Sequence, residues 1–84
     1  MKLKKFNMKK TIQDYTGKFE LSRETYTTLN CWLNLTNDDI IGCLKSDLIF
    51  IADKYYRVPR EQLINYYVDG KVGLINLTLV EYND

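Results

Sequence analysis

The feature that most constrains this chain is the run of apolar residues between Asn37 and Arg57. Successive residues of an α-helix are turned by about 100°. At that spacing the apolar residues of the run fall within one sector of roughly 120°. They are Ile40, Ile41, Leu44, Leu48, Ile51, Ala52 and Tyr55. The pattern predicts one long amphipathic helix over residues 37–57.

The residues at the two ends of this segment agree with a helix. Asn37 suits the N-cap position, because its side-chain oxygen can accept from a free backbone N–H of the first turn. Asp38 and Asp39 place negative charge at the positive end of the helix dipole, and Arg57 places positive charge at the other end. Val58-Pro59 then ends the run, since the residue before proline avoids the helical conformation.

Alternating patterns elsewhere predict strands. In residues 24–35, apolar side chains occupy one parity, with Cys31 among them, while the other parity is polar except for Trp32. Residues 71–82 read as a further strand with apolar residues on both faces, which predicts a central position in the sheet. Residues 11–21 are interpreted as a hairpin that turns at Thr16-Gly17.

Residues 59–68 are compatible with two structures. As a helix, Pro59 would occupy the first helical position and Gly70 would close the C-terminal end. As a strand, residues 63–68 would turn at Asp69-Gly70 and pair with residues 71–82, because Asp-Gly is a preferred hairpin turn. The hairpin is favoured, although short apolar runs do not separate the two alternatives by pattern alone.

Together these segments predict an α+β fold, in which a small antiparallel sheet of about four to five strands packs against the long helix. The 84 residues suffice for a single domain over residues 1–84, in which residues 1–10 form a basic arm or an edge strand. No apolar run approaches a membrane span, and no secretory signal is recognised, so we expect a cytoplasmic protein.

The sequence argues against an enzyme. It contains no histidine, the commonest general base at neutral pH and the commonest metal ligand. The two cysteines, Cys31 and Cys43, are twelve residues apart and suit buried reduced thiols better than a zinc site. The four glycines are isolated, so no phosphate-binding loop is present. We therefore expect no catalytic residue, cofactor or metal.

Two groups of apolar and aromatic residues go beyond what the hydrophobic core requires. On the predicted helix, Cys43 and Phe50 lie seven residues apart on the far side, with Asp47 and Lys54 beside them. Two interpretations of Phe50 are open. Either the N-terminal arm or a loop folds over it, or it is a docking surface, since an exposed aromatic residue with charged neighbours resembles the centre and rim of a protein interface. Seven tyrosines, two pairs of them adjacent, add further contact candidates. The predicted partner-binding residues are Phe50, Cys43, Asp47, Lys54, Trp32, Tyr56 and Tyr67.

The alternative partner is nucleic acid. Five of the twelve basic residues lie in the first ten positions, namely Lys2, Lys4, Lys5, Lys9 and Lys10. This arm could contact phosphates. Leu48-x-x-Ile51-Ala52, followed by Val58 and Leu63, resembles the repressor-type helix–turn–helix family, which would imply DNA binding. The turn lacks the glycine of that family, and its spacing is one residue too long. The rest of the chain carries seven basic and eleven acidic residues.

By elimination, the sequence predicts a small protein-binding module without enzymatic activity. An inhibitor, adaptor or immunity-type accessory protein of a phage or mobile element could act at this size by steric blocking of a protein target. The expected partner is a protein target or a second copy of the chain, with self-association giving a dimer. A nucleic-acid-binding regulator that uses the N-terminal lysines is the alternative.

Overall fold

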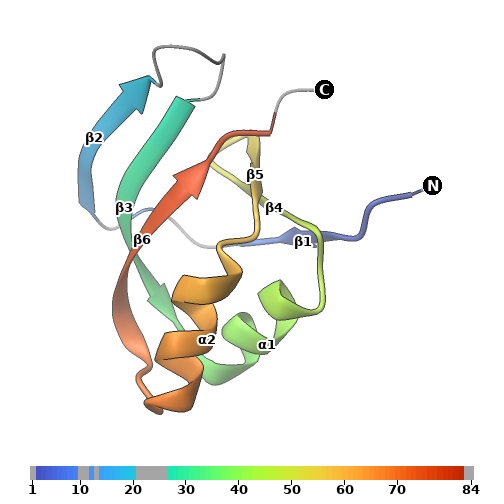
Figure 1. Cartoon of the computed structure of the whole chain (residues 1–84), viewed down its shortest axis with the longest axis vertical. Helices are drawn as coiled ribbons and strands as arrows, with labels where there is room; N and C mark the ends of the chain where they lie inside the picture. Colours follow the sequence, from blue (N-terminus) through green and yellow to red (C-terminus); the bar gives the residue numbers. More distant parts are fainter. Residues whose placement is uncertain (1, 10–11, 13, 21–26, 83–84) are drawn as a thin grey trace.

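The computed structural model describes residues 2–9, 12, 14–20 and 27–82. It shows two three-stranded sheets and two short helices, so the predicted α+β class is confirmed (Figure 1). Both helices lie side by side at one end of the molecule. In chain order the elements are β1 (Lys5–Asn7), β2 (Asp14–Glu20), β3 (Thr27–Leu35), α1 (Asn37–Leu44), β4 (Leu48–Ile51), β5 (Lys54–Arg57), α2 (Arg60–Val68) and β6 (Gly73–Val80).

The first sheet is antiparallel, with the strand order β2-β3-β6. The prediction of a strand in residues 24–35 is confirmed over residues 27–35 by β3, in which Leu29, Cys31, Leu33 and Leu35 are buried. Residues 24–26 lie outside the described residues. The prediction for residues 71–82 is right about the strand and wrong about its place, because β6 is at the edge and β3 is central. The turn predicted at Thr16-Gly17 is also wrong. There β2 continues, with a shift in register between Tyr15 and Gly17.

The second sheet has the order β1-β4-β5 and is mixed, since β1 runs parallel to β4 and β4 antiparallel to β5. The backbone N–H groups of Asp47 and Leu48 both donate to the carbonyl of Lys4, and that of Met8 donates to the carbonyl of Phe50. Of the two alternatives for the arm, the structure therefore has the edge strand. The two sheets meet at a bridge between Tyr56 and Glu81.

The single long helix over residues 37–57 is wrong. Only residues 37–44 are helical, and the N-cap is Thr36 rather than Asn37. The Thr36 hydroxyl accepts from the backbone N–H of Asp39 (3.2 Å), and the Asp39 carboxylate accepts from the Thr36 N–H (2.8 Å). This capping box starts the helix. At its other end, the guanidinium of Arg60 donates to the carbonyls of Leu44 (2.8 Å) and Ser46 (2.6 Å).

The second half of the predicted helix forms the β4–β5 hairpin. The run Leu48–Ile51 is rich in β-branched and aromatic residues, which suit a strand. Strand β1 supplies backbone partners for this run that a helix would not need. The hairpin closes through Ala52 and Asp53, both with positive φ, although neither is glycine. Apolar spacing fits a helix equally well here, so long-range pairing decided the structure. The helix–turn–helix suggested by residues 48–63 is absent for the same reason.

The favoured hairpin for residues 63–82 is likewise wrong, and the alternative helix is present as α2. Side-chain contacts bind α2 to the free edge of β6. The Gln62 amide bonds both backbone groups of Thr78, and the Tyr66 hydroxyl donates to the carbonyl of Asn76 (3.0 Å). A helix can supply such contacts in place of a fourth strand. Leu63, on the inner side of α2, is fully buried.

The core lies between the helices and the inner faces of the two sheets. Its fully buried members include Leu33, Leu35, Ile40, Ile49, Leu63, Leu77 and Leu79. Phe6 of β1 packs against this core and lies directly over Gly42 of α1. The short N-terminal strand is thereby held to the body at both its backbone and its side chain. Within the described residues, no helix has the length and apolar character required to cross a bilayer.

Candidate interaction surfaces

The outward face of the β1-β4-β5 sheet carries an aromatic pair. The register places Asn7, Phe50 and Tyr55 in one row across the three strands. The rings of Phe50 and Tyr55 lie 4.8 Å apart between centroids, at an interplanar angle of 50°. The Lys5 ammonium lies 4.8 Å from the centre of the Tyr55 ring, within the range of a cation–π contact. These three residues come from three different strands, and together they define the aromatic face.

The surroundings of the aromatic face are moderately basic. The Asp47 carboxylate accepts from the backbone N–H of Lys4 (2.8 Å), so this acid fixes the start of β1. The Lys54 ammonium forms a salt bridge with Glu81 (3.5 Å). Basic side chains outnumber acidic ones on β1, β4, β5 and the residues next to them. The basic ones are Lys4, Lys5, Lys9, Lys54 and Arg57, and the acidic ones are Asp47, Asp53 and, at the bridge to β5, Glu81.

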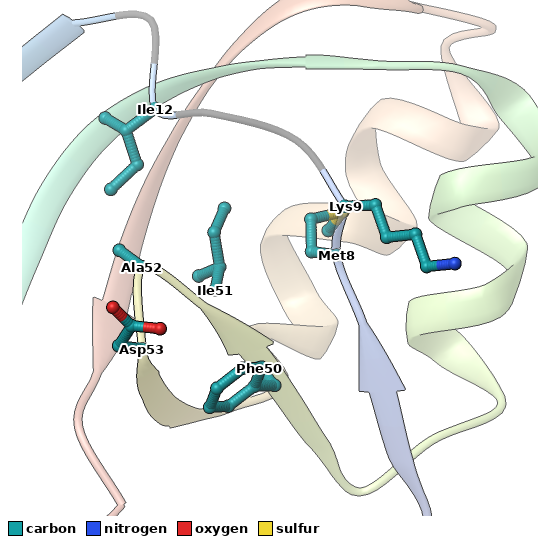
Figure 2. A pocket seen from close by; sticks show the side chains of 7 residues that line it. All are labelled: Met8, Lys9, Ile12, Phe50, Ile51, Ala52 and Asp53. Atoms are coloured by element: carbon teal, nitrogen blue, oxygen red, sulfur yellow. The ribbon is translucent and has the colours of Figure 1, made fainter.

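A groove of about 400 Å³ opens beside Phe50, between the segment that follows β1 and the β4–β5 turn (Figure 2). Met8 and Ile51 are buried and provide an apolar floor, while Lys9 and Asp53 are exposed. Figure 2 shows that Lys9 and Asp53 lie at opposite ends of this groove. Its lining residues are Met8, Lys9, Ile12, Phe50, Ile51, Ala52 and Asp53. Such a groove could accept one apolar side chain of a partner.

A second unusual surface follows α2 and the start of β6. Val68 is 76% exposed, more than any other large hydrophobic residue in the described part of the chain. Ile64, one turn earlier, is 47% exposed, and Tyr67 beside it is equally exposed. Val72 and Leu74 follow directly after the helix and are also exposed. The helical spacing of Ile64 and Val68 places them on one ridge of α2, turned by roughly 100° and 140° from the buried Leu63.

The structure separates the residues that the sequence grouped as partner-binding. Phe50, Asp47 and Lys54 lie on β4, β5 or their connections, but they are brought together by a sheet and not by a helix. Cys43 and Tyr56 are buried, with exposed fractions of 0% and 3%. These two are therefore unavailable to a docking partner. The predicted stripe that joined Cys43 to Phe50 does not exist, because the helix ends before Phe50.

Trp32 and Tyr67 lie away from the aromatic face. Trp32 is half-buried on β3 in the other sheet, opposite Asn76 of β6. Tyr67 is exposed on α2. Of the N-terminal lysines, Lys2, Lys4, Lys5 and Lys9 are exposed, and Lys10 lies outside the described residues. The sequence predicts the lysine arm as a contact for nucleic acid and Phe50 as a contact for a protein. The structure places both on one sheet.

Sequence reasoning missed Tyr55, Ile64 and Val68 as surface residues. The helical spacing predicts Tyr55 on the buried side of the long helix, but in β5 it alternates with the buried Tyr56 and is 37% exposed. The favoured hairpin predicts Ile64 and Val68 in a strand. The helical alternative for residues 59–68 would have found them, since residues four apart share one helix face.

Both cysteines are reduced and buried. Burial raises the pKa of Cys31 from 9.0 to about 11. Burial, together with the nearby Asp39 carboxylate, raises the pKa of Cys43 from 9.0 to about 12. Neither thiol is therefore a thiolate near neutral pH, the form needed for nucleophilic attack or metal binding. In the part of the chain that the structure describes, no three His, Cys, Asp or Glu residues are grouped to hold a metal ion.

Comparison with protein-family models gives no match, and neither curated proteins nor solved structures show significant similarity to this chain.

Proposed function

We propose that this chain is a protein-binding module without enzymatic activity, which docks through the aromatic face onto an acidic surface of a protein target. The observation that carries the proposal is the Phe50–Tyr55 ring pair, partly open to solvent, with Lys5 over Tyr55. Aromatic side chains on a rigid sheet lose little conformational entropy on binding and are enriched among the residues that dominate interface energies.

The groove beside Phe50 supports the same proposal. Anchor residues at protein interfaces fill pockets on the partner, and the apolar floor of Met8 and Ile51 offers one. Lys5, Lys9 and Arg57 would form the charged rim and attract carboxylates. A target that presents an apolar side chain among acidic residues fits this combination of groove and rim. Occupying about 800 Å² of its surface would block it sterically.

A second candidate is binding of single-stranded nucleic acid to the same face. The observation that favours it is the position of β1, which places a lysine against an exposed ring, as in proteins that stack bases. Protein is favoured over nucleic acid because the excess of cations around the face is small. Lys54 is also paired with Glu81. One ring pair offers a stacking site for only one or two bases.

The matched variants Tyr55→Ser and Tyr67→Ser test the proposal. Both remove an exposed tyrosine, but only Tyr55 belongs to the aromatic face. Wild type and both variants serve as baits in a lysate of the host, and captured proteins are identified by mass spectrometry. The expected target is retained by wild type and by Tyr67→Ser and lost with Tyr55→Ser. Calorimetry with the purified target should then show a roughly tenfold or larger loss of affinity for Tyr55→Ser.

The same three proteins are titrated with a fluorescent 20-nucleotide single-stranded DNA and RNA at low salt. Tight binding that Tyr55→Ser removes, and that falls steeply with salt, would replace the protein proposal with the nucleic-acid one. Equal capture of every protein by wild type and Tyr55→Ser, without binding of oligonucleotide, would contradict both candidates.

A further inference from the structure

The backbone of β1 bonds to β4 through every second residue. The carbonyl of Lys4 accepts from a backbone N–H of β4 (3.0 Å), and the N–H of Met8 donates to a carbonyl of the same strand (2.9 Å). Because the backbone groups of successive strand residues point to opposite sides, those of Lys5 and Asn7 point away from β4. Within the described residues, β4 is the only strand beside β1, and no hydrogen bond is made to these outward groups.

Two other sheet edges are covered within the molecule. Helix α2 covers the edge of β6 through Gln62. The chain that follows β6 runs beside β5, where the N–H of Tyr82 donates to the carbonyl of Tyr55 (2.8 Å). In β1, by contrast, Lys5 and Asn7 are both exposed. An exposed edge with unpaired backbone groups is a template for a further strand.

The chain around this edge is positively charged. Residues 1–10 contain five lysines and no acidic residue. The exposed lysines among the described residues of this segment are Lys2, Lys4, Lys5 and Lys9. The Asp47 carboxylate, which contacts the start of β1, is already bonded to the backbone N–H of Lys4. An acidic segment is therefore the electrostatic complement of the edge.

We propose that an extended acidic segment of the protein target adds to the β1-β4-β5 sheet as a fourth strand along the outer edge of β1. Its backbone bonds to the outward N–H and C=O groups of Lys5 and Asn7, and its carboxylates lie among the exposed lysines. Every second side chain of the added strand extends the row of Asn7, Phe50 and Tyr55 on the aromatic face. The inference rests on the proposed function and states the form in which the target is bound.

An acidic peptide fits the edge better than the other occupants do. A second copy that paired through its own β1 would set lysines against lysines, and like charges opposite each other in a sheet are destabilising. The phosphates of a nucleic acid accept hydrogen bonds but donate none to the outward carbonyls of Lys5 and Asn7. A peptide backbone supplies both donors and acceptors.

Selection from a display library of random peptides, each about ten residues long, provides the probe. The enriched sequences should be acidic, and a synthetic peptide of the most enriched sequence should bind wild type more weakly as the salt concentration rises. Amide hydrogen exchange of wild type is then followed by NMR with and without this peptide. The peptide should slow exchange at Lys5 and Asn7 roughly tenfold or more, whereas Phe6 and Met8, whose N–H groups face β4, should be protected in both samples.

The matched variants Asn7→Pro and Asn7→Ala test the backbone contact. Asn7→Pro removes an outward N–H and leaves the bonds to β4 in place, since proline is tolerated where the N–H side of an edge strand faces solvent. Asn7→Ala removes the side chain and keeps the N–H. Affinity for the synthetic peptide should fall roughly tenfold with Asn7→Pro and less than about twofold with Asn7→Ala. The exchange measurement on wild type remains decisive if Asn7→Pro fails to fold.

Selection without an enriched acidic peptide, or exchange at Lys5 and Asn7 that the peptide leaves unchanged, would overturn the inference. A wild-type dimer that Asn7→Pro dissociates, or an oligonucleotide that protects the same two amides, would assign the edge to another occupant and overturn it too. A lysate target that Tyr55→Ser loses and Asn7→Pro retains would keep the proposed function and overturn only the strand addition. The proposed function itself fails on a different result, which is equal capture by wild type and Tyr55→Ser.

Discussion

Gln62 and Thr78 are joined by two hydrogen bonds. In them, the side-chain amide of Gln62 takes the place that the backbone of a neighbouring strand would have. The Gln62 amide nitrogen donates to the Thr78 carbonyl (2.9 Å), and the Gln62 carbonyl oxygen accepts from the Thr78 N–H (2.8 Å). These backbone groups of β6 point away from β3, so they would otherwise face solvent at the edge of the sheet. The contact both docks α2 and blocks an edge that could pair with another chain.

Replacing Gln62 by glutamate should therefore destabilise the protein by about 1–3 kcal/mol. The carboxylate loses the N–H donor and sets a negative charge against the Thr78 carbonyl. Urea unfolding at neutral pH measures the effect. Asn65→Asp is the matched control, because it makes the same amide-to-acid change on the exposed side of α2. Equal effects of the two changes would show that the added charge, and not the bond to Thr78, is responsible.

Gly42 should not tolerate alanine. In an exposed helix, glycine-to-alanine stabilises by about 1 kcal/mol. Here a Cβ on Gly42 would overlap the ring of Phe6, which itself packs against the core. We expect Gly42→Ala to lower the free energy of unfolding by about 1–3 kcal/mol.

The companion variant Phe6→Leu separates the two contributions at Gly42. In a double-mutant cycle, part of the cost of Gly42→Ala should disappear when the ring is absent. Stabilisation by Gly42→Ala in the wild-type background would show that β1 does not dock on α1 as described.

A substitution in the turn between β4 and β5 should raise the free energy of unfolding. Ala52 and Asp53 have φ of 53° and 62°, a conformation that costs a residue with a side chain roughly 1–2 kcal/mol and glycine almost nothing. Asp53→Gly should raise the free energy of unfolding by about 0.5–1 kcal/mol. Asp69→Gly, at an α2 C-cap with φ of −76°, should not stabilise. Thermal unfolding of both variants measures the difference, and a gain at Asp69 alone would contradict this account.

Stability should fall in alkaline solution because of the two buried thiols. Their pKa values in the folded state, about 11 for Cys31 and about 12 for Cys43, exceed the ordinary value of 9.0. At a pH between 9.0 and the folded-state pKa, the unfolded chain has released the thiol protons and the folded chain has kept them. The free energy of unfolding therefore has its full value below pH 9 and falls as the pH rises toward 11–12.

Each thiol should contribute a slope of about −1.4 kcal/mol per pH unit within that window. Urea midpoints between pH 8 and 10.5, compared with those of Cys31→Ala/Cys43→Ala, isolate the contribution of the two thiols. The double variant should show a shallower decline. Parallel curves for the two proteins would exclude a contribution from the thiols.

The sequence by itself determined the elements whose signals are local. Alternation in residues 24–35 predicted β3, because one face of that strand lies in the core, and the apolar run of residues 71–82 predicted β6, although not its place at the edge of the sheet. Pro59 and Gly70 bounded the alternative that proved to be α2, since proline and glycine act on their own backbone. Burial of Cys31 followed from the same alternation.

Only the tertiary structure decided the rest. The apolar run from Ile40 to Tyr55 satisfies a helix and a helix followed by a hairpin equally well, and β1, more than forty residues earlier in the chain, selected the hairpin by offering backbone partners to β4. The aromatic face followed from that pairing, because it turned Phe50 and Tyr55 to the same side and brought Lys5 to them. Periodicity records which residues prefer burial. It does not record which distant segment satisfies their backbone hydrogen bonds.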